Sequence, residues 1–122
     1  MPPKPSPELN ANQVERILRL VGLGVRSRGA IVGVERVREA AKSGKLALAL
    51  IAVDASKNAL DKVLPLLTAR RINFIEVPSA AELGAVAGRD QVAAVGVVDP
   101  QLANGIVALT RTGSSRAPEE GV

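Results

Sequence analysis

The stretch "LALALIAVD", residues 46–54, decides the fold of this chain because apolar residues fill every position before Asp54. A strand with one face in water alternates apolar and polar side chains, whereas a strand covered on both faces is apolar throughout. The run therefore predicts a central strand with helices on both sides of the sheet. A second run of the same kind, "VAAVGVVD" at 92–99, predicts another central strand.

Helical patterns and shorter strand patterns surround these two runs. We predict a helix from residue 10 or 12 that fails near Gly22–Gly24, a strand at 30–32, a helix at 34–43, a helix from Ser56 to about residue 69, a strand at 73–77, a helix capped by Ser79 with Glu82 at capping-box spacing, and a last helix starting near Pro100. Pro65 predicts a kink or an early stop in the third helix. The alternation predicts an α/β fold, a three-layer α/β/α sandwich with a small mixed sheet of about four strands.

The domain organisation follows from composition along the chain of 122 residues. Residues 10–110 are predicted to form a single domain, between a flexible Pro-rich leader at 1–9 and a flexible polar tail at 111–122. The longest apolar run is too short to cross a bilayer, and the first residues contain no apolar signal region. We therefore expect a cytoplasmic protein with no membrane partner.

Composition also excludes most catalytic chemistry. The chain contains no Cys and no His, so disulfides, the usual zinc sites and Ser–His or Cys–His pairs are absent. "GLGVRSRG" (22–29) departs from the dinucleotide-binding pattern because Ser27 stands where that pattern needs glycine. Asp54 and Asp99 each end a predicted strand, and we interpret them as turn and capping residues. We expect no enzyme activity, no catalytic residue, no metal and no cofactor.

The basic residues suggest an anionic partner. Net charge is +4, and Arg26, Arg28 and Arg36 gather around the predicted start of the helix at 34–43. Gly29 and Gly33 allow close backbone approach, and a helix start offers free N–H groups to a phosphate. The chain has a single aromatic residue, so binding of single strands by base stacking is disfavoured and structured RNA fits better.

Three features carry a family resemblance over about residues 11–109: "GVERVREAAKSGKLALALIAVDAS" (33–56), "VPSAAELGAVAG" (77–88) and the order of helices and strands. With them the chain resembles the L-seven-Ae superfamily of ribosomal and kink-turn-binding proteins, and most closely its bacterial YlxQ-type members. The second stretch is similar to the family signature VPS-x-x-ELG-x-x-x-G almost residue for residue.

The resemblance implies RNA binding without catalysis. Family members grip a kink-turn, a bent internal loop with tandem sheared G·A pairs, through the start of the second helix and the loop after the ELG helix. These segments are Gly33–Arg36 and Gly88–Val92 in this chain. The predicted RNA-binding residues are Arg26, Arg28, Gly29, Gly33, Val34, Glu35, Arg36, Arg89, Asp90, Gln91 and Val92. The expected partner is structured RNA, with ribosomal RNA as a candidate, and the expected state is a monomer.

The helix start departs from the family pattern, which leaves alternatives open. Kink-turn binders of the family commonly have Gly-Thr-Asn-Glu there, whereas this chain has Gly33-Val34-Glu35-Arg36. Arg36 can read a guanine edge through two hydrogen bonds, so RNA recognition is compatible with the change. The alternative is a protein-interaction module that keeps the fold but has lost kink-turn recognition. A third hypothesis is a small-molecule site at the carboxyl ends of the strands.

Overall fold

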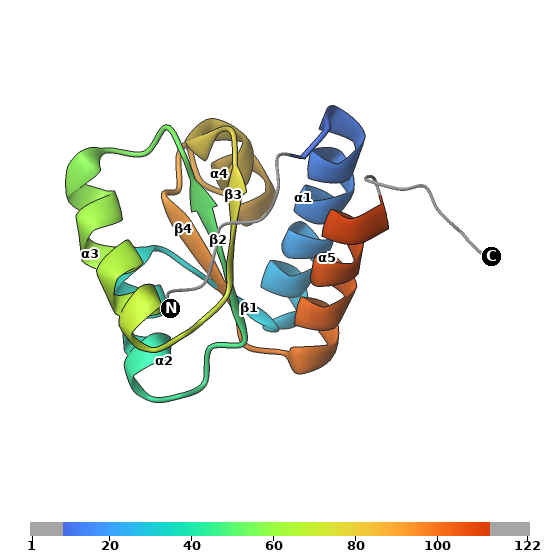
Figure 1. Cartoon of the computed structure of the whole chain (residues 1–122). Helices are drawn as coiled ribbons and strands as arrows, with labels where there is room; N and C mark the ends of the chain where they lie inside the picture. Colours follow the sequence, from blue (N-terminus) through green and yellow to red (C-terminus); the bar gives the residue numbers. More distant parts are fainter. Residues whose placement is uncertain (1–8, 113–122) are drawn as a thin grey trace.

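A computed structural model of the chain describes residues 9–112. The predicted leader (1–9) and tail (111–122) therefore fall almost entirely outside the described residues. Between residues 9 and 112, no helix combines the length and the apolar character needed to cross a membrane. Helices and strands alternate along this part of the chain (Figure 1). The elements are α1 (Ala11–Ser27), β1 (Ala30–Val32), α2 (Val34–Lys42), β2 (Leu48–Ala52), α3 (Lys57–Ala69), β3 (Phe74–Val77), α4 (Ala80–Ala87), β4 (Ala94–Val97) and α5 (Pro100–Thr112).

The four strands form one mixed sheet in the order β1-β4-β2-β3. Strand β4 is antiparallel to both of its neighbours, β1 and β2, and β2 is parallel to β3. The two strands predicted as central from their continuous apolar sequence, β2 and β4, are the two inner strands. The predicted mixed four-stranded sheet is confirmed.

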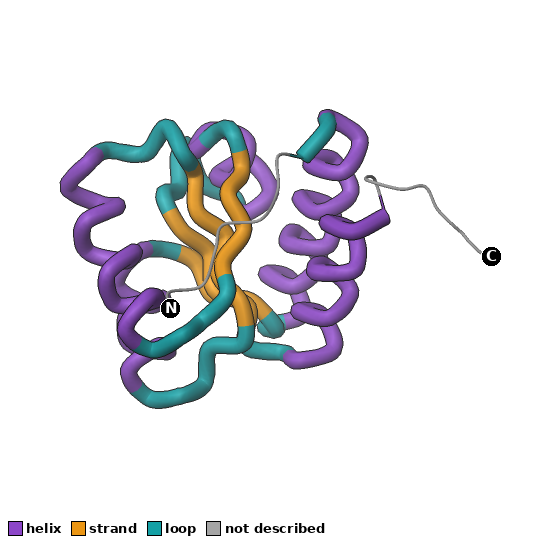
Figure 2. Tube along the Cα trace, viewed as in Figure 1, coloured by secondary structure: helices purple, strands orange, loops and turns teal. Residues whose placement is uncertain are grey.

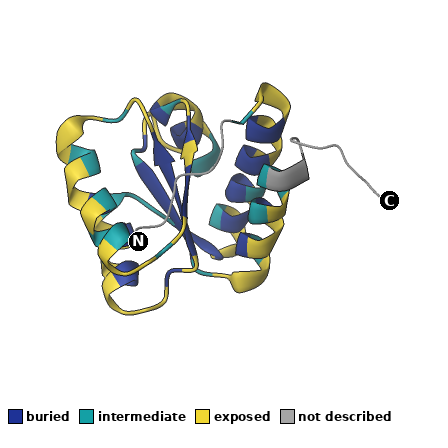
Figure 3. Cartoon of the chain, in the orientation of Figure 1, coloured by how far each residue is buried: buried dark blue, intermediate teal, exposed yellow. Residues whose placement is uncertain are grey.

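Helices cover both faces of the sheet, which makes the predicted three-layer sandwich (Figures 1 and 2). Helices α1, α4 and α5 pack on one face, and α2 and α3 pack on the other. Strand β2 shows why its sequence has no polar position. Leu48 and Leu50 point into the core beneath α1, whereas Ala49 and Ile51 point into the core beneath α2 and α3. The sheet is accordingly buried between exposed outer helix faces (Figure 3).

Of the two predicted starting points of the first helix, residues 10 and 12, the structure uses Asn10 as the cap. The side chain of Asn10 accepts a hydrogen bond from the backbone N–H of Gln13, and the backbone N–H of Asn10 donates to the Gln13 side chain. The amide of Gln13 also donates to the carbonyl of Leu109 at 2.9 Å, which ties the start of α1 to the end of α5.

The predicted failure of this helix near Gly22–Gly24 is wrong, because α1 continues to Ser27. The two glycines are contact positions rather than stops. A Cβ atom at Gly24 would lie 2.3 Å from Leu102 of α5, and one at Gly22 would lie 3.4 Å from Val86 of α4. Close packing against two helices thus overrides the low helix propensity of glycine.

The predicted early stop at Pro65 is also absent, because α3 runs from Lys57 to Ala69 through the proline. Proline removes the N–H that would bond to the carbonyl four residues earlier. Pro65 and Asp61 are both exposed, so water can replace the lost hydrogen bond.

Three helices start at one edge of the sheet. Strands β1, β2 and β3 run in the same direction, since β1 and β2 are both antiparallel to β4 and β3 is parallel to β2. Their carboxyl ends therefore share an edge, and α2, α3 and α4 begin there. The loop at 88–93 returns to the same edge to enter β4. Both segments predicted to contact RNA lie at this edge.

Candidate nucleic-acid interface

Three arginines from separate segments line one depression of about 460 Å³. Arg28 follows α1, Arg36 lies in the first turn of α2, and Arg89 lies in the loop after α4. We call this depression the arginine groove. Its lining residues are Val25, Arg28, Ala30, Ile31, Val32, Arg36, Ala87 and Arg89. The structure thus brings together three of the cations that the sequence marks as candidates.

Arg28 is positioned by the end of α1. It is the C-cap residue, with a left-handed backbone (φ 67°), and its N–H donates to the carbonyls of Gly24 and Val25. A left-handed residue after a helix is usually glycine, because side chains disfavour this conformation. The turn directs the chain from α1 into β1 and leaves the Arg28 side chain exposed at the groove.

Arg36 is positioned by an uncapped helix start. Gly33 precedes α2 with φ 105° and ψ 153°, a region that is almost exclusive to glycine. Gly33 has no side chain to bond the first N–H groups of α2. These N–H groups and the partial positive charge of the helix start are suited to an anion, and Arg36 adds a full charge beside them.

Arg89 is positioned by the way the loop folds back on α4. Gly88 ends α4 with a left-handed backbone (φ 77°), and the N–H of Arg89 donates to the carbonyl of Gly84 at 2.8 Å. Gly84 lies directly under this loop. A Cβ atom there would lie 2.9 Å from the Arg89 carbonyl oxygen and from the backbone of Gln91. Gly84 is therefore a positioning residue that the sequence analysis missed, although the "ELG" motif contains it.

The three groove arginines are not paired with carboxylates of the described residues. The ion pairs of the described residues are Arg19–Glu15, Arg38–Glu35, Lys57–Asp61 and Lys62–Glu35. None of these pairs includes a groove arginine. An incoming phosphate would therefore meet guanidinium groups that need not release a carboxylate first.

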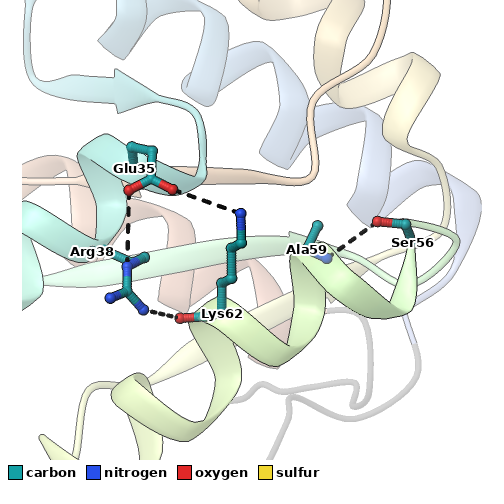
Figure 4. Close-up of polar contacts among 5 residues, drawn as sticks. All are labelled: Glu35, Arg38, Ser56, Ala59 and Lys62. Atoms are coloured by element: carbon teal, nitrogen blue, oxygen red, sulfur yellow. Dashed lines mark hydrogen bonds and ion pairs between the residues drawn. The ribbon is translucent and has the colours of Figure 1, made fainter.

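The carboxylate of Glu35 points toward Arg38 and Lys62 (Figure 4). It lies 4.0 Å from Arg38 and 4.0 Å from Lys62 of α3, and Arg38 also donates to the Lys62 carbonyl at 2.7 Å. Glu35 is 78% exposed, so these long ion pairs contribute little stability. Glu35 and Arg36 thus face different surfaces. Arg36 lines the arginine groove and Glu35 does not.

The other predicted contacts divide between surface and interior. Arg26 is exposed in the last turn of α1, and Asp90 and Gln91 are exposed in the loop after α4, but none of them lines the groove. Val34 is half-buried against the core between α2, α3 and the sheet. Val92 is buried beneath α4, and its N–H donates to the Ala80 carbonyl at 3.0 Å.

Gly29 is also interior rather than open to a ligand. It is buried, and its carbonyl accepts hydrogen bonds from the N–H groups of Val98 and Asp99. A Cβ atom at this position would lie 3.2 Å from the side chain of Asp99. The glycine thus lets the turn after α1 pack against the end of β4.

The carboxylates at the strand ends cap backbone, as the sequence predicts. Asp99 accepts from the N–H of Gln101 at 2.9 Å, and Asp54 accepts from the N–H of Ala80 at 2.7 Å. Ser79 caps α4 by accepting from the N–H of Glu82. The structure of residues 9–112 thus forms one of the two bonds of the predicted capping box, and Asp54 bonds the next N–H of this helix start, that of Ala80.

A sequence profile of the Ribosomal protein L7Ae/L30e/S12e/Gadd45 family matches residues 15–107. The chain belongs to this family. The match begins within α1 and ends within α5, and it includes all three groove arginines. A comparison with curated protein sequences finds no match.

Two solved structures share the fold. A protein of unknown function from Bacillus halodurans C is 27% identical, with a TM-score of 0.71, and the alignment covers 78% of this chain and 96% of that one. The 15.5kD RNA binding protein of Giardia lamblia is 20% identical, also with a TM-score of 0.71, and the alignment covers 85% and 89% of the two chains. Both likenesses extend over most of each chain, so the fold is shared as a whole.

Proposed function

We propose that this chain binds structured RNA, with the arginine groove as the main contact surface. The observation that carries the proposal is the convergence of Arg28, Arg36 and Arg89 on one depression beside the uncapped start of α2. Guanidinium groups bind phosphate oxygens and guanine edges through paired hydrogen bonds. Membership of a family that includes ribosomal proteins supports RNA as the anion. The fold shared with an RNA binding protein of Giardia lamblia adds to this support.

The recognised RNA element is, in our proposal, a kink-turn or a closely similar bend. This hypothesis requires Gly33–Arg36 and Gly88–Val92, and it is supported by a hydrogen bond from the Gly33 N–H to the carbonyl of Ala94, the residue of β4 that lies two positions after the second segment. Arg36 replaces a glutamate that is common at this place in kink-turn binders, so the guanine would be read by a donor rather than by an acceptor. We expect the preferred RNA to differ in sequence from a standard kink-turn at this position. A ribosomal RNA is the first candidate.

Binding assays on two RNAs test the proposal. One RNA carries a kink-turn, and the other has Watson–Crick pairs in place of the sheared G·A pairs. Affinities are measured at about 50 and about 200 mM salt, a range in which each phosphate contact has a visible effect. We expect tighter binding to the bent RNA and a clear fall in affinity with salt.

Arg89→Ala provides the site-specific test, with Arg16→Ala as its matched control. Both arginines are exposed and lie outside the ion pairs of the described residues, but Arg16 is on the outer face of α1. Arg89→Ala should lower the log–log salt slope by roughly 0.7 to 0.9. Arg16→Ala should leave the slope unchanged. If the wild-type chain binds neither RNA but retains protein partners, the interaction-module alternative replaces this proposal.

A further inference from the structure

The exposed side of α1 is a ridge of arginines with one leucine among them. Arg16, Arg19, Leu23 and Arg26 are three or four positions apart, so they share one exposed face of the helix. The opposite face of α1 packs in the core against the sheet, α4 and α5. We call the four residues the α1 ridge. None of them lines the arginine groove, so the ridge is a second basic surface of the molecule.

Leu23 lies in the middle of this basic surface. Leu23 and Val53 are the exposed large apolar residues of the described part of the chain, 9–112, and the Leu23 side chain is 52% exposed. A single exposed leucine is common and by itself indicates nothing. Here, however, arginines precede and follow it on the same helix face. An apolar centre with a charged rim is typical of a protein–protein contact, in which arginine is enriched.

Two guanidinium groups flank Leu23 at defined levels along the helix. The Nη2 atom of Arg19 lies 3.0 Å from the carboxylate of Glu15, one turn before its own Cα atom. A Cβ atom at Gly22 would lie 3.5 Å from the Nη1 atom of Arg26, so this guanidinium also lies one turn back. The two groups are level with residues 15 and 22, which are separated by about 10 Å at about 1.5 Å per residue. The Leu23 side chain leans toward the start of α1 in the same way and therefore lies between them.

We propose that the α1 ridge docks an acidic amphipathic helix of a partner protein. An apolar residue of the partner packs on Leu23, and two carboxylates seven positions apart face Arg19 and Arg26. Seven residues of a helix also span about 10 Å and return to nearly the same face. Glutamates at positions i and i+7, with a leucine at i+3 or i+4, therefore fit the spacing of the ridge. This surface is independent of the RNA binding proposed above.

Charge favours this partner over two others. Among the ion pairs of residues 9–112, Glu15 is the one carboxylate that contacts the ridge, and neighbouring α5 has no charged residue between positions 100 and 110. The Glu15–Arg19 pair is 65% and 75% exposed, so it contributes little stability and can be exchanged for a partner's carboxylate. A second copy packed ridge on ridge would bring arginines against arginines. A phosphate backbone would leave Leu23 without an apolar contact.

Binding of two synthetic helical peptides to the full chain tests the docking surface. Both have about 20 residues, enough for an isolated helix. The matching peptide has glutamates at i and i+7 with a leucine at i+3, and the second has the same composition with the glutamates moved to the opposite face. Amide chemical shifts map each contact. We expect the matching peptide to shift residues 16–27, to bind at least about fivefold more tightly than the second, and to bind more weakly as salt rises.

Substitutions in the ridge give the site-specific test. Leu23→Ser and Arg19→Ala should each weaken binding of the matching peptide by about two- to fivefold. Arg71→Ala, which removes an exposed arginine after α3, should leave it unchanged. Arg19→Glu should abolish binding, and a peptide with lysine in place of the facing glutamate should restore it. Circular dichroism checks that each variant is folded, as expected for changes at exposed positions.

Three results would overturn the inference. In the first, the two peptides bind alike, shift the arginine groove instead of α1, or fail to bind at about 1 mM. In the second, kink-turn RNA shifts residues 16–23, which would assign the ridge to RNA. In the third, the chain alone sediments as a dimer that Leu23→Ser dissociates, which would assign the ridge to a second copy. The RNA affinities of Leu23→Ser and Arg19→Ala should equal that of the wild type, so failure here leaves the proposed function intact.

Discussion

The backbone N–H of Gly33 donates a 2.9 Å hydrogen bond to the carbonyl oxygen of Ala94. Gly33 is the N-cap of α2, and Ala94 is the first residue of β4, directly after the loop that contains Arg89. The bond therefore holds the start of α2, which contributes Arg36 to the arginine groove, beside the start of β4, which follows the loop that contributes Arg89. Their relative position depends on the sheet edge rather than on exposed side chains.

Gly33→Ala should destabilise the protein by about 1 to 3 kcal/mol, because φ 105° with ψ 153° is strained for any residue with a side chain. No atom lies within 4 Å of the new Cβ, so the cost is conformational rather than steric. A residue with a side chain would be tolerated at position 33 only if its φ were negative, and the φ of Gly33 is positive. Urea denaturation measures the loss, and RNA affinity should fall as well.

Gly105→Ala is the matched control for Gly33→Ala. Gly105 lies within α5, where the nearest atom to a new Cβ would be 3.8 Å away. Alanine should raise the free energy of unfolding there by about 0.5 to 1 kcal/mol and leave RNA binding intact. A destabilisation of equal size at both positions would contradict the assignment of backbone strain to Gly33.

Arg28→Gly should separate stability from binding. Glycine suits the left-handed backbone of this position (φ 67°), so the free energy of unfolding should rise or stay within about 1 kcal/mol of the wild-type value. The same change removes a groove cation, so affinity for RNA should fall and the salt slope should drop by roughly 0.7 to 0.9. Melting curves and binding titrations at two salt concentrations measure both effects.

Arg71→Gly offers a close control for Arg28→Gly. Arg71 is also an exposed arginine just beyond a helix, with φ 57°, but it follows α3 and does not line the arginine groove. Its replacement should have the same small effect on stability and should leave RNA affinity unchanged. Equal losses of affinity in the two variants would show a general charge effect instead of a groove contact.

Gly84→Ala should displace the loop that contains Arg89. The added Cβ would lie 2.9 Å from backbone atoms of Arg89 and Gln91, closer than packed atoms allow, so the loop must move. We expect a loss of about 1 to 3 kcal/mol in stability and weaker RNA binding. Amide chemical shifts of residues 88–93 report the displacement directly.

A neighbouring substitution separates the loop displacement from simple loss of stability. Ala85→Gly changes an exposed position of the same helix and should cost up to about 1 kcal/mol through helix propensity. Because it leaves the contact between α4 and the loop intact, its RNA affinity should match that of the wild type. A Gly84→Ala protein that binds RNA with full affinity would remove Gly84 from the positioning role.

Arg36→Glu should raise the stability of the protein and weaken its binding to the preferred RNA. An acidic residue in the first turn of α2 interacts favourably with the helix dipole, so stability should rise by about 0.3 to 1 kcal/mol. The guanidinium contact is lost, so the preferred RNA should bind more weakly, while a standard kink-turn should gain relative to it. Melting temperature and affinity for both RNAs are measured together. If the affinities for the preferred RNA and for the standard kink-turn are both unchanged, Arg36 lies outside the RNA interface.

The sequence predicted the layers of the fold well because burial leaves a direct pattern in it. The continuous apolar residues of β2 and β4 required cover on both faces, and Leu48 and Ile51 do point to opposite cores. Local capping signals were equally readable. Asn10, Ser56 and Ser79 each cap the helix that their position predicted.

Glycine and proline were harder to interpret, because their effect depends on what lies beside them. Gly22 and Gly24 look like a helix stop in sequence, yet α1 continues through them, and a Cβ atom there would lie 3.4 Å from Val86 of α4 and 2.3 Å from Leu102 of α5. Pro65 breaks no helix because its face is exposed to water. Local propensity is a weak preference of about 1 kcal/mol for glycine, and tertiary packing overrides it.

By itself, the sequence determined the three layers, the two central strands and the set of arginines from which a site could be built. Only the tertiary structure decided which of those residues meet. Arg28, Arg36 and Arg89 come from three separate segments and share one groove, whereas Glu35, the neighbour of Arg36, pairs with Arg38 and Lys62 instead. Periodicity along a chain reports which side of an element is buried, but the position of one element against another depends on sheet register and close contacts, which no local pattern records.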